Sequence, residues 1–128
     1  MRTSLLVDTD VMVDYLRGSA TGVAFLRKHT DRVVLSSIVV AELYAGVREG
    51  REQEDLDSLV SIFNVIPVTA DIARAAGLLK RDFGGSHGVG LADALLAATA
   101  MTEKAELATL NAKHYPMIKG LKPAYSKG

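Results

Sequence analysis

Three carboxylates stand alone in apolar segments of this 128-residue chain, and they are the residues best suited to chemistry. Asp8 directly follows three apolar residues. Glu42 is the only charged residue between positions 33 and 47, and Asp93 is the only one between positions 88 and 102. We expect each carboxylate to be at least partly buried, which is costly unless the charge is neutralised or bound to a cation. The same segments hold no nearby Arg or Lys that could neutralise them.

If Asp8, Glu42 and Asp93 converge in one cleft, their mutual repulsion must be relieved by protonation or by a hard cation. Mg²⁺ and Mn²⁺ are the natural partners, because both prefer oxygen ligands and complete their coordination with water and substrate phosphate. Such a centre activates water and neutralises the charge that develops on a phosphodiester. The three acids therefore indicate metal-dependent phosphodiester hydrolysis.

Each acid also has a simpler explanation, which the sequence leaves open. Asp8 could be a helix N-cap, although Asp10 is the better candidate because Val11 opens the apolar pattern of the next helix. Glu42 could project from the edge of an amphipathic helix. Asp93 could cap its own helix and interact favourably with the helix dipole. That all three simple explanations hold at once is much less expected than that any one of them does.

Composition argues against several other kinds of site. The chain has no cysteine, which excludes disulfides, thiolate zinc sites and cysteine nucleophiles and suits the reducing cytoplasm. The three histidines at 29, 87 and 114 are scattered, and each is interpreted as an ordinary surface residue. Lys plus Arg equals Asp plus Glu at 15 each, so net charge by itself gives no indication of a nucleic-acid partner. No apolar run is long enough to cross a membrane, and the N-terminus is unlike a signal peptide, so we expect a cytoplasmic protein.

Short apolar runs alternate with helical patterns from one end of the chain to the other. The patterns predict strands at 4–7, 32–36, 64–68 and 106–110, with a fifth near 116–118. They predict helices at 11–18, 21–29, 37–47 (capped by Ser37), 51–63, 71–83 and 91–103, a glycine-rich loop at 84–90 and a turn or short helix at 111–115. This alternation is typical of an α/β fold with a parallel sheet, in which ligands bind beyond the carboxyl ends of the strands.

Four segments, taken in order, resemble the sequence motifs of one family, the PIN-domain ribonucleases, and specifically the VapC-type toxins of prokaryotic toxin–antitoxin pairs. They are Leu6-Val-Asp8-Thr-Asp-Val, Leu35-Ser-Ser-Ile-Val-Val-Ala-Glu42-Leu-Tyr-Ala-Gly46, Asp93-Ala-Leu-Leu-Ala-Ala-Thr-Ala100 and Ala108-Thr-Leu-Asn111-Ala-Lys-His-Tyr115. The match covers essentially the whole chain. Each motif alone is weak, but four in register make a specific resemblance.

The resemblance implies a single PIN domain over residues 1–128, with a three-layer α/β/α fold around a short central parallel sheet. It implies an endoribonuclease that uses Mg²⁺ or Mn²⁺ and cuts structured RNA, either tRNA or rRNA. It also implies a homodimer and a VapB-type antitoxin as partner. Asp8, Glu42 and Asp93 are the metal ligands by this resemblance, and Asn111 joins them in catalysis.

Asn111 departs from the family pattern, because many PIN domains carry a fourth Asp there. Its amide oxygen could orient a metal-bound water but adds no charge, so a second metal should bind more weakly or only with substrate. Thr109 could hydrogen-bond a carboxylate, or it could be an ordinary strand residue. Lys113 is the best candidate for a phosphate contact, although a solvated turn lysine is equally expected.

Two other functions would fit parts of the pattern. A catalytically inactive PIN-like module would bind RNA or protein without cutting, but the three retained acids argue against it. A receiver-type signalling domain has a similar length and an acidic pair after its first strand. It also needs a strand between residues 72 and 104, where this sequence is helical in pattern.

Overall fold

The computed structural model describes residues 3–126, without the side chains of residues 86 and 87. Within that range four short strands form one parallel sheet in the order β3-β2-β1-β4. The strands are β1 (Leu5–Val7), β2 (Val33–Ser36), β3 (Asn64–Ile66) and β4 (Glu106–Ala108). Leu5 pairs with Val33 on one side and with Glu106 on the other, which places β1 in the middle of the sheet.

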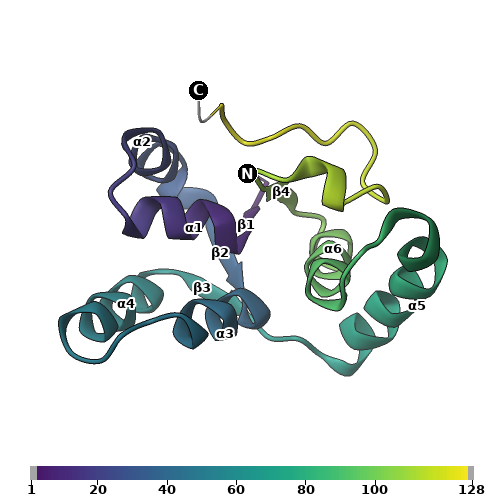
Figure 1. Ribbon diagram of the computed structural model, residues 1–128, viewed down its shortest axis with the longest axis horizontal. Helices are drawn as coiled ribbons and strands as arrows, with labels where there is room; N and C mark the ends of the chain where they lie inside the picture. Colours follow the sequence, from purple (N-terminus) through teal and green to yellow (C-terminus); the bar gives the residue numbers. More distant parts are fainter. Residues whose placement is uncertain (1–2, 127–128) are drawn as a thin grey trace.

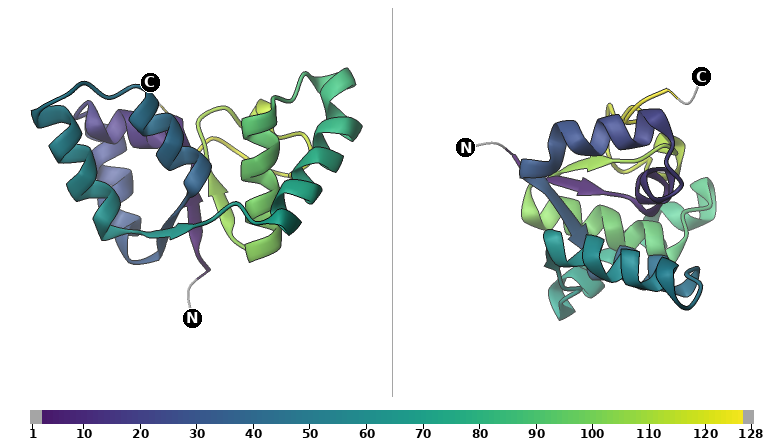
Figure 2. Two further views of the ribbon diagram at one scale, coloured as in Figure 1. Left: turned by 90° about the horizontal axis from the view of Figure 1, so that it is seen from below. Right: turned by 90° about the vertical axis from the view of Figure 1, so that its left-hand side faces the viewer.

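Helices cover both faces of this sheet. They are α1 (Thr9–Leu16), α2 (Ala20–His29), α3 (Ser37–Ala45), α4 (Arg51–Ile62), α5 (Ala70–His87) and α6 (Leu91–Glu103), with 3-10 turns η1 (Thr30–Arg32) and η2 (Ala112–His114). Figure 1 shows α1, α2 and α4 on one side of the sheet and α5 and α6 on the other, and Figure 2 shows the same division from below. The expected three-layer α/β/α architecture is confirmed.

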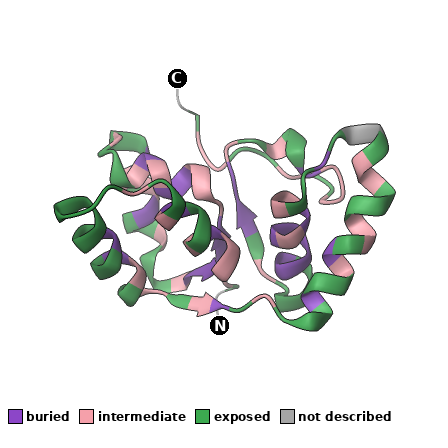
Figure 3. Ribbon diagram, turned by 60° about the horizontal axis from the view of Figure 1, so that its bottom comes forward, coloured by how far each residue is buried: buried purple, intermediate pink, exposed green. Residues whose placement is uncertain are grey.

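Apolar burial between these layers explains why so short a sheet is stable. β1 and β2 are buried along their whole length, and α6 buries a continuous alanine-rich face that includes Ala97 and Ala98. Small side chains let α6 approach its neighbours closely, and α5 and α6 pack along one another. Figure 3 shows buried residues concentrated on the central strands and on inward helix faces, with exposed residues on the outer helices.

Several element boundaries differ from the sequence prediction. Helix α5 continues through Gly84 and Gly85 to His87, so the predicted loop shrinks to Gly88–Gly90, where Gly88 adopts φ +66° and ends the helix. Ser36, not Ser37, caps α3, because its side chain accepts from the Ile38 amide.

The predicted fifth strand at 116–118 was also wrong, since this segment is a turn in the described structure. The Ile118 amide bonds back to the Tyr115 carbonyl at 3.0 Å, and Pro116 has no amide hydrogen to offer a sheet.

The receiver-domain alternative is wrong, because residues 72–104 form α5, a short loop at 88–90 and α6, and contain no strand where that fold needs one. Among the residues described, no helix is long and apolar enough to cross a membrane.

Candidate functional site

The site begins where β1 ends and α1 starts. Asp8 lies in extended backbone just after β1 and is the N-cap of α1, with Oδ1 accepting from the Thr9 amide at 2.7 Å. The prediction that Asp10 would be the cap was therefore wrong. The cap uses only one oxygen of Asp8, so its Oδ2 is directed to other partners, and capping and site roles are combined in one residue.

Those partners come from the end of β4 and the segment beyond it. Asp8 Oδ2 accepts from Thr109 Oγ1 at 2.8 Å and from the Tyr115 hydroxyl at 2.7 Å. Thr109 is completely buried and Tyr115 is 1% exposed, so both donors are fixed by the core. Thr109, considered as a carboxylate partner from its position in the sequence, makes such a bond here.

Asp93 reaches the same place from the first turn of α6. Its Oδ1 lies 3.2 Å from the Tyr115 hydroxyl, and its Oδ2 lies 3.5 Å from Nδ1 of His114. Burial raises the pKa of the Asp93 carboxyl, and the neighbouring Asp8 carboxylate raises it further. The two predicted acids Asp8 and Asp93 thus meet at one tyrosine hydroxyl.

Glu42 is placed differently and is exposed, which contradicts the expectation that it would be partly buried. It lies on the outer side of α3, where its Oε1 accepts from Thr9 Oγ1 at 2.6 Å. It also lines an open groove of about 460 Å³ between α1, α3 and α4, together with Arg17 and Arg48. In the described part of the chain, Glu42 is therefore linked to Asp8 through Thr9, the residue that follows Asp8.

The sequence pattern predicted only a helix-capping role for Asp10. Its Oδ2 accepts from the Leu110 amide and from Nδ2 of Asn111, each at 3.0 Å, so it ties α1 to the segment after β4. Burial raises the pKa of its carboxyl, and the Asp8 carboxylate adds to this rise. Its Oδ1 is buried and accepts no hydrogen bond from any described residue.

Tyr115 and His114 were also missed by sequence reasoning. Most of the predicted turn at 111–115 forms the 3-10 turn η2. His114, at its end, and the following Tyr115 contact acids that are distant in sequence. Burial raises the pKa of the Tyr115 phenol, and the Asp8 carboxylate raises it further, so the phenol stays protonated and acts as a donor. His114 contacts Asp93, so it is more than an ordinary surface residue.

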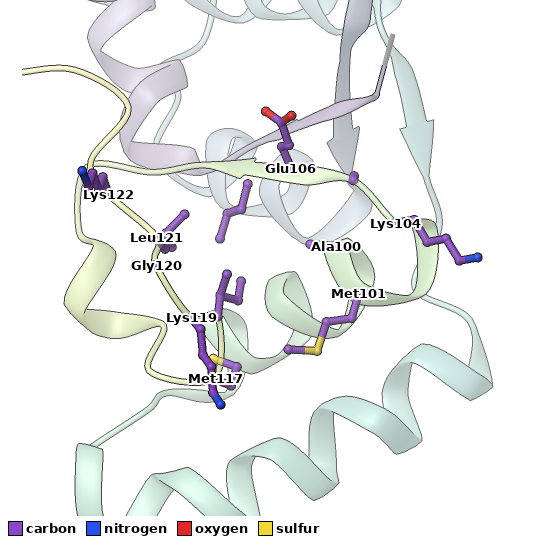
Figure 4. A pocket seen from close by; sticks show the side chains of 12 residues that line it. Ala100, Met101, Lys104, Glu106, Met117, Lys119, Gly120, Leu121 and Lys122 are labelled. Atoms are coloured by element: carbon purple, nitrogen blue, oxygen red, sulfur yellow. The ribbon is translucent and has the colours of Figure 1, made fainter. Parts of the chain in front are cut away.

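The remaining predicted residues lie at the rim. Asn111 is exposed and its amide nitrogen donates to Asp10, while Lys113 is exposed on η2. A separate pocket of about 560 Å³ lies between α6, β4 and residues 117–122, and its lining residues include Lys104, Lys119 and Lys122 (Figure 4). That pocket contains none of the predicted site residues.

The acidic side chains at this site offer carboxylate oxygens, which are the ligands that hard divalent cations prefer. The buried Oδ1 of Asp10 adds an oxygen that has no hydrogen-bond partner among the described residues. In the described range, however, no three acids or histidines are arranged closely enough to hold one metal ion as they stand. Asp8 and Asp93 share a contact, and Glu42 would have to turn inward from its position beside Thr9.

Comparison with known proteins identifies the same family as the motifs. Residues 5–117 match the PIN domain family model. The chain is 40% identical over 127 residues to Ribonuclease VapC19 of Mycobacterium tuberculosis, with 94% of this chain and 98% of that protein covered.

Solved structures give the same result. A toxin–antitoxin complex from Klebsiella pneumoniae contains a chain with a TM-score of 0.83 and 27% identity, covering 95% of this chain and 98% of that one. VapBC2 from Rickettsia felis, bound to a DNA fragment from its promoter, has a TM-score of 0.72 and 26% identity, covering 91% and 94%. All of these similarities extend over nearly the whole chain.

Proposed function

We propose that this chain, which belongs to the PIN-domain family, is a VapC-type endoribonuclease that needs Mg²⁺ or Mn²⁺ to hydrolyse phosphodiester bonds in RNA. The observation that carries the proposal is the meeting of Asp8 and Asp93 at the Tyr115 hydroxyl, beyond the carboxyl ends of β1 and β4. Two carboxylates that share a partly buried site without an Arg or Lys between them are suited to a cation.

Asp8 and Asp93 would hold the metal, and Glu42 would complete the ligand set from the open side. A bound Mg²⁺ or Mn²⁺ activates water and neutralises charge on the phosphodiester. Asn111 contributes an amide at the rim and adds no charge, so we propose one firmly bound metal. The role of Asp10 is to hold the Asn111 segment against α1, through its bonds to Leu110 and Asn111.

The substrate class follows from charge and from the relatives. The chain has equal numbers of acidic and basic residues, so its net charge supplies no overall attraction for a long polyanion. A metal at the acids would supply local attraction for one phosphate, with Lys113 at the rim as a second contact. We propose a structured RNA substrate, tRNA or rRNA, because a folded loop can present one phosphodiester by its shape.

The partner is proposed to be a VapB-type antitoxin, because the solved relatives include VapBC and toxin–antitoxin complexes. An acid-lined site is electrostatically suited to a cationic side chain of such a partner. We also propose that the chain forms a homodimer in the cytoplasm and that residues 1–128 make one PIN domain. Co-expression with the product of the neighbouring gene should silence cleavage and yield a hetero-oligomer. A stable monomer that never binds this product would contradict the partner proposal.

The test is cleavage of purified tRNA and rRNA by the isolated chain after EDTA treatment, with and without added Mg²⁺ or Mn²⁺. The expected result is discrete fragments that appear only with added metal. RNA binding without any cleavage at any metal concentration would instead indicate an inactive PIN-like binding module. Equal cleavage with EDTA present would contradict metal dependence.

A further inference from the structure

The Tyr115 hydroxyl has a position that packing alone does not require. It lies 2.7 Å from Asp8 Oδ2 and 3.2 Å from Asp93 Oδ1. A phenylalanine would fill the same buried space, and a buried hydroxyl costs free energy unless it is hydrogen-bonded. A hydroxyl has one proton to donate, so the shorter bond goes to Asp8, and the same group lies against Asp93.

The two acids depend on this hydroxyl to different degrees. Asp8 is held by three donors: the Thr9 amide, Thr109 Oγ1 and the Tyr115 hydroxyl. Asp93 has contacts from the Tyr115 hydroxyl and from the His114 imidazole, and the side chain of His114 is half exposed. The buried Tyr115 hydroxyl is therefore the rigid contact that orients the Asp93 carboxylate. Asp8 would keep its orientation without this hydroxyl, because two other donors hold it.

Tyr115 is itself held firmly. It is 1% exposed and belongs to the main apolar core, so its ring cannot move without disturbing the packing of that core. Its backbone is tied at both ends, with its amide bonded to the Ala112 carbonyl and its carbonyl accepting from the Ile118 amide. The core thus fixes one oxygen atom at the point where two site carboxylates from distant elements meet.

We propose that Tyr115 is a positioning residue for metal binding: its hydroxyl holds the Asp8 and Asp93 carboxylates at the spacing at which they bind one divalent cation together. This inference rests on the metal-dependent function proposed above. Groups that hydrogen-bond to metal ligands orient them, and removing such a group typically weakens metal affinity tenfold to a hundredfold. The opposite possibility, that the hydroxyl occupies the place of the cation and competes with it, is an outcome of the test.

The chain contains a matched control for the Tyr115→Phe variant. Tyr125 donates its hydroxyl to Asp14 Oδ2 at 2.8 Å, Asp14 is 5% exposed, and no hydrogen bond among the described residues joins Tyr125 to the proposed ligands Asp8, Glu42 and Asp93. Tyr125→Phe therefore removes the same kind of bond, from a phenol to a buried carboxylate, elsewhere in the fold. We would titrate Mn²⁺ into both variants and the parent, measure free Mn²⁺ by electron paramagnetic resonance, and record metal-free melting temperatures.

The expected result is a Mn²⁺ dissociation constant about tenfold higher for Tyr115→Phe and unchanged for Tyr125→Phe, with both variants folded. An unchanged constant for Tyr115→Phe, with only a lower melting temperature, would show a purely structural role and overturn the proposal. A lower constant would show competition and overturn it equally. If the parent cuts RNA only with metal and the Mn²⁺ dissociation constant of Tyr115→Phe is unchanged, the positioning role fails and the proposed function is retained. A parent that binds no Mn²⁺ would overturn both.

A second measurement uses the parent chain and does not depend on the folding of Tyr115→Phe. Adding Mg²⁺ to the metal-free parent should change the ultraviolet absorption of a tyrosine, because the hydrogen bonding of the Tyr115 hydroxyl changes when its two acceptors bind a cation. The same difference spectrum should persist in Tyr125→Phe. A parent that binds Mg²⁺ without any tyrosine difference spectrum would contradict the proposal.

Discussion

The two sides of the candidate site are built in different ways. On the closed side, Asp8 and Asp93 are fixed by Thr109 and Tyr115, which are buried donors at the end of β4 and just beyond it. On the open side, Glu42 is exposed beside a groove, and its bond to Thr9 is its link to the other acids. If these acids hold a metal as proposed, the closed side would supply a preformed pair of ligands, and the open side would leave the third free to adjust when metal and RNA bind.

Replacing a ligand on either side should give the largest effect. Asp8→Asn and Glu42→Gln should each lower metal-dependent RNA cleavage by roughly a hundredfold or more, because each removes a negative oxygen from the proposed metal. Cleavage of tRNA and rRNA in excess Mn²⁺ measures this loss, with circular dichroism as the control for folding. If Glu42→Gln cut RNA like the parent, the open side would not belong to the site.

Replacing Thr109 or Thr9 by valine makes the same chemical change on the closed side and on the open side of the site. Thr109→Val removes a buried hydroxyl that donates to Asp8 and accepts from the Asn111 amide, whereas Thr9→Val removes a hydroxyl that faces exposed Glu42. We expect Thr109→Val to cost about 1–3 kcal/mol of unfolding free energy and Thr9→Val clearly less. Urea denaturation of the metal-free variants measures both. Equal losses would mean that the two sides are equally rigid.

The acids of the closed side should also make stability depend on pH. Burial raises the folded-state pKa of Asp10 and of Asp93 above the ordinary value of 3.8. A raised carboxyl pKa means that the folded state binds the proton more tightly than the unfolded chain does. The contribution of these groups therefore becomes more favourable as pH falls from neutral through the raised values, and stops changing below about pH 3.8.

The difference in melting temperature between the metal-free parent and Asp93→Asn isolates the contribution of the Asp93 carboxyl to the pH dependence of stability. The variant should be the more stable at pH 7, and its advantage should shrink as the pH is lowered. An advantage that stays constant between pH 7 and pH 4 would contradict the raised pKa of Asp93.

The smallest expected effect concerns RNA binding at the rim. Lys113 is exposed on η2, two residues after Asn111. If it contacts a phosphate, Lys113→Ala should reduce the slope of log affinity against log salt by about one, without moving the cleavage site. Lys28→Ala on α2 is the control, since that lysine is exposed on a helix that supplies no site residue. An unchanged slope for Lys113→Ala would make it an ordinary surface lysine.

The sequence could predict the layers and the acids, because both depend on local pattern. Alternating apolar runs and helical periods define the strands and helices, and lone acids in apolar runs are visible without a structure. The ends of the elements were harder to predict. Gly84 and Gly85 each weaken a helix by only about 1 kcal/mol, which the packing of α5 on α6 can offset.

Tyr115 could not be predicted as part of the site. Its bond to Asp8 joins residues 107 positions apart, and no local pattern shows which buried aromatic places its hydroxyl against an acid. Asp10 gave a partial signal, because two acids separated by one residue at the start of a helix cannot both be its cap. The exposure of Glu42 depended on how α3 is rotated, and a helix that is apolar on nearly every side does not fix that rotation.

Cleavage by the Asp93→Asn variant is the decisive measurement for a metal-dependent site at these acids, because Asp93 lies beside Asp8 at the shared hydroxyl but has fewer other contacts to disturb. The purified variant and the parent should be compared on the same tRNA and rRNA with Mg²⁺ or Mn²⁺ in excess. We expect the variant to fold, to melt at the same temperature as the parent or higher when metal-free, and not to cut. A folded Asp93→Asn variant that cuts RNA as well as the parent would contradict a metal-dependent site at these acids.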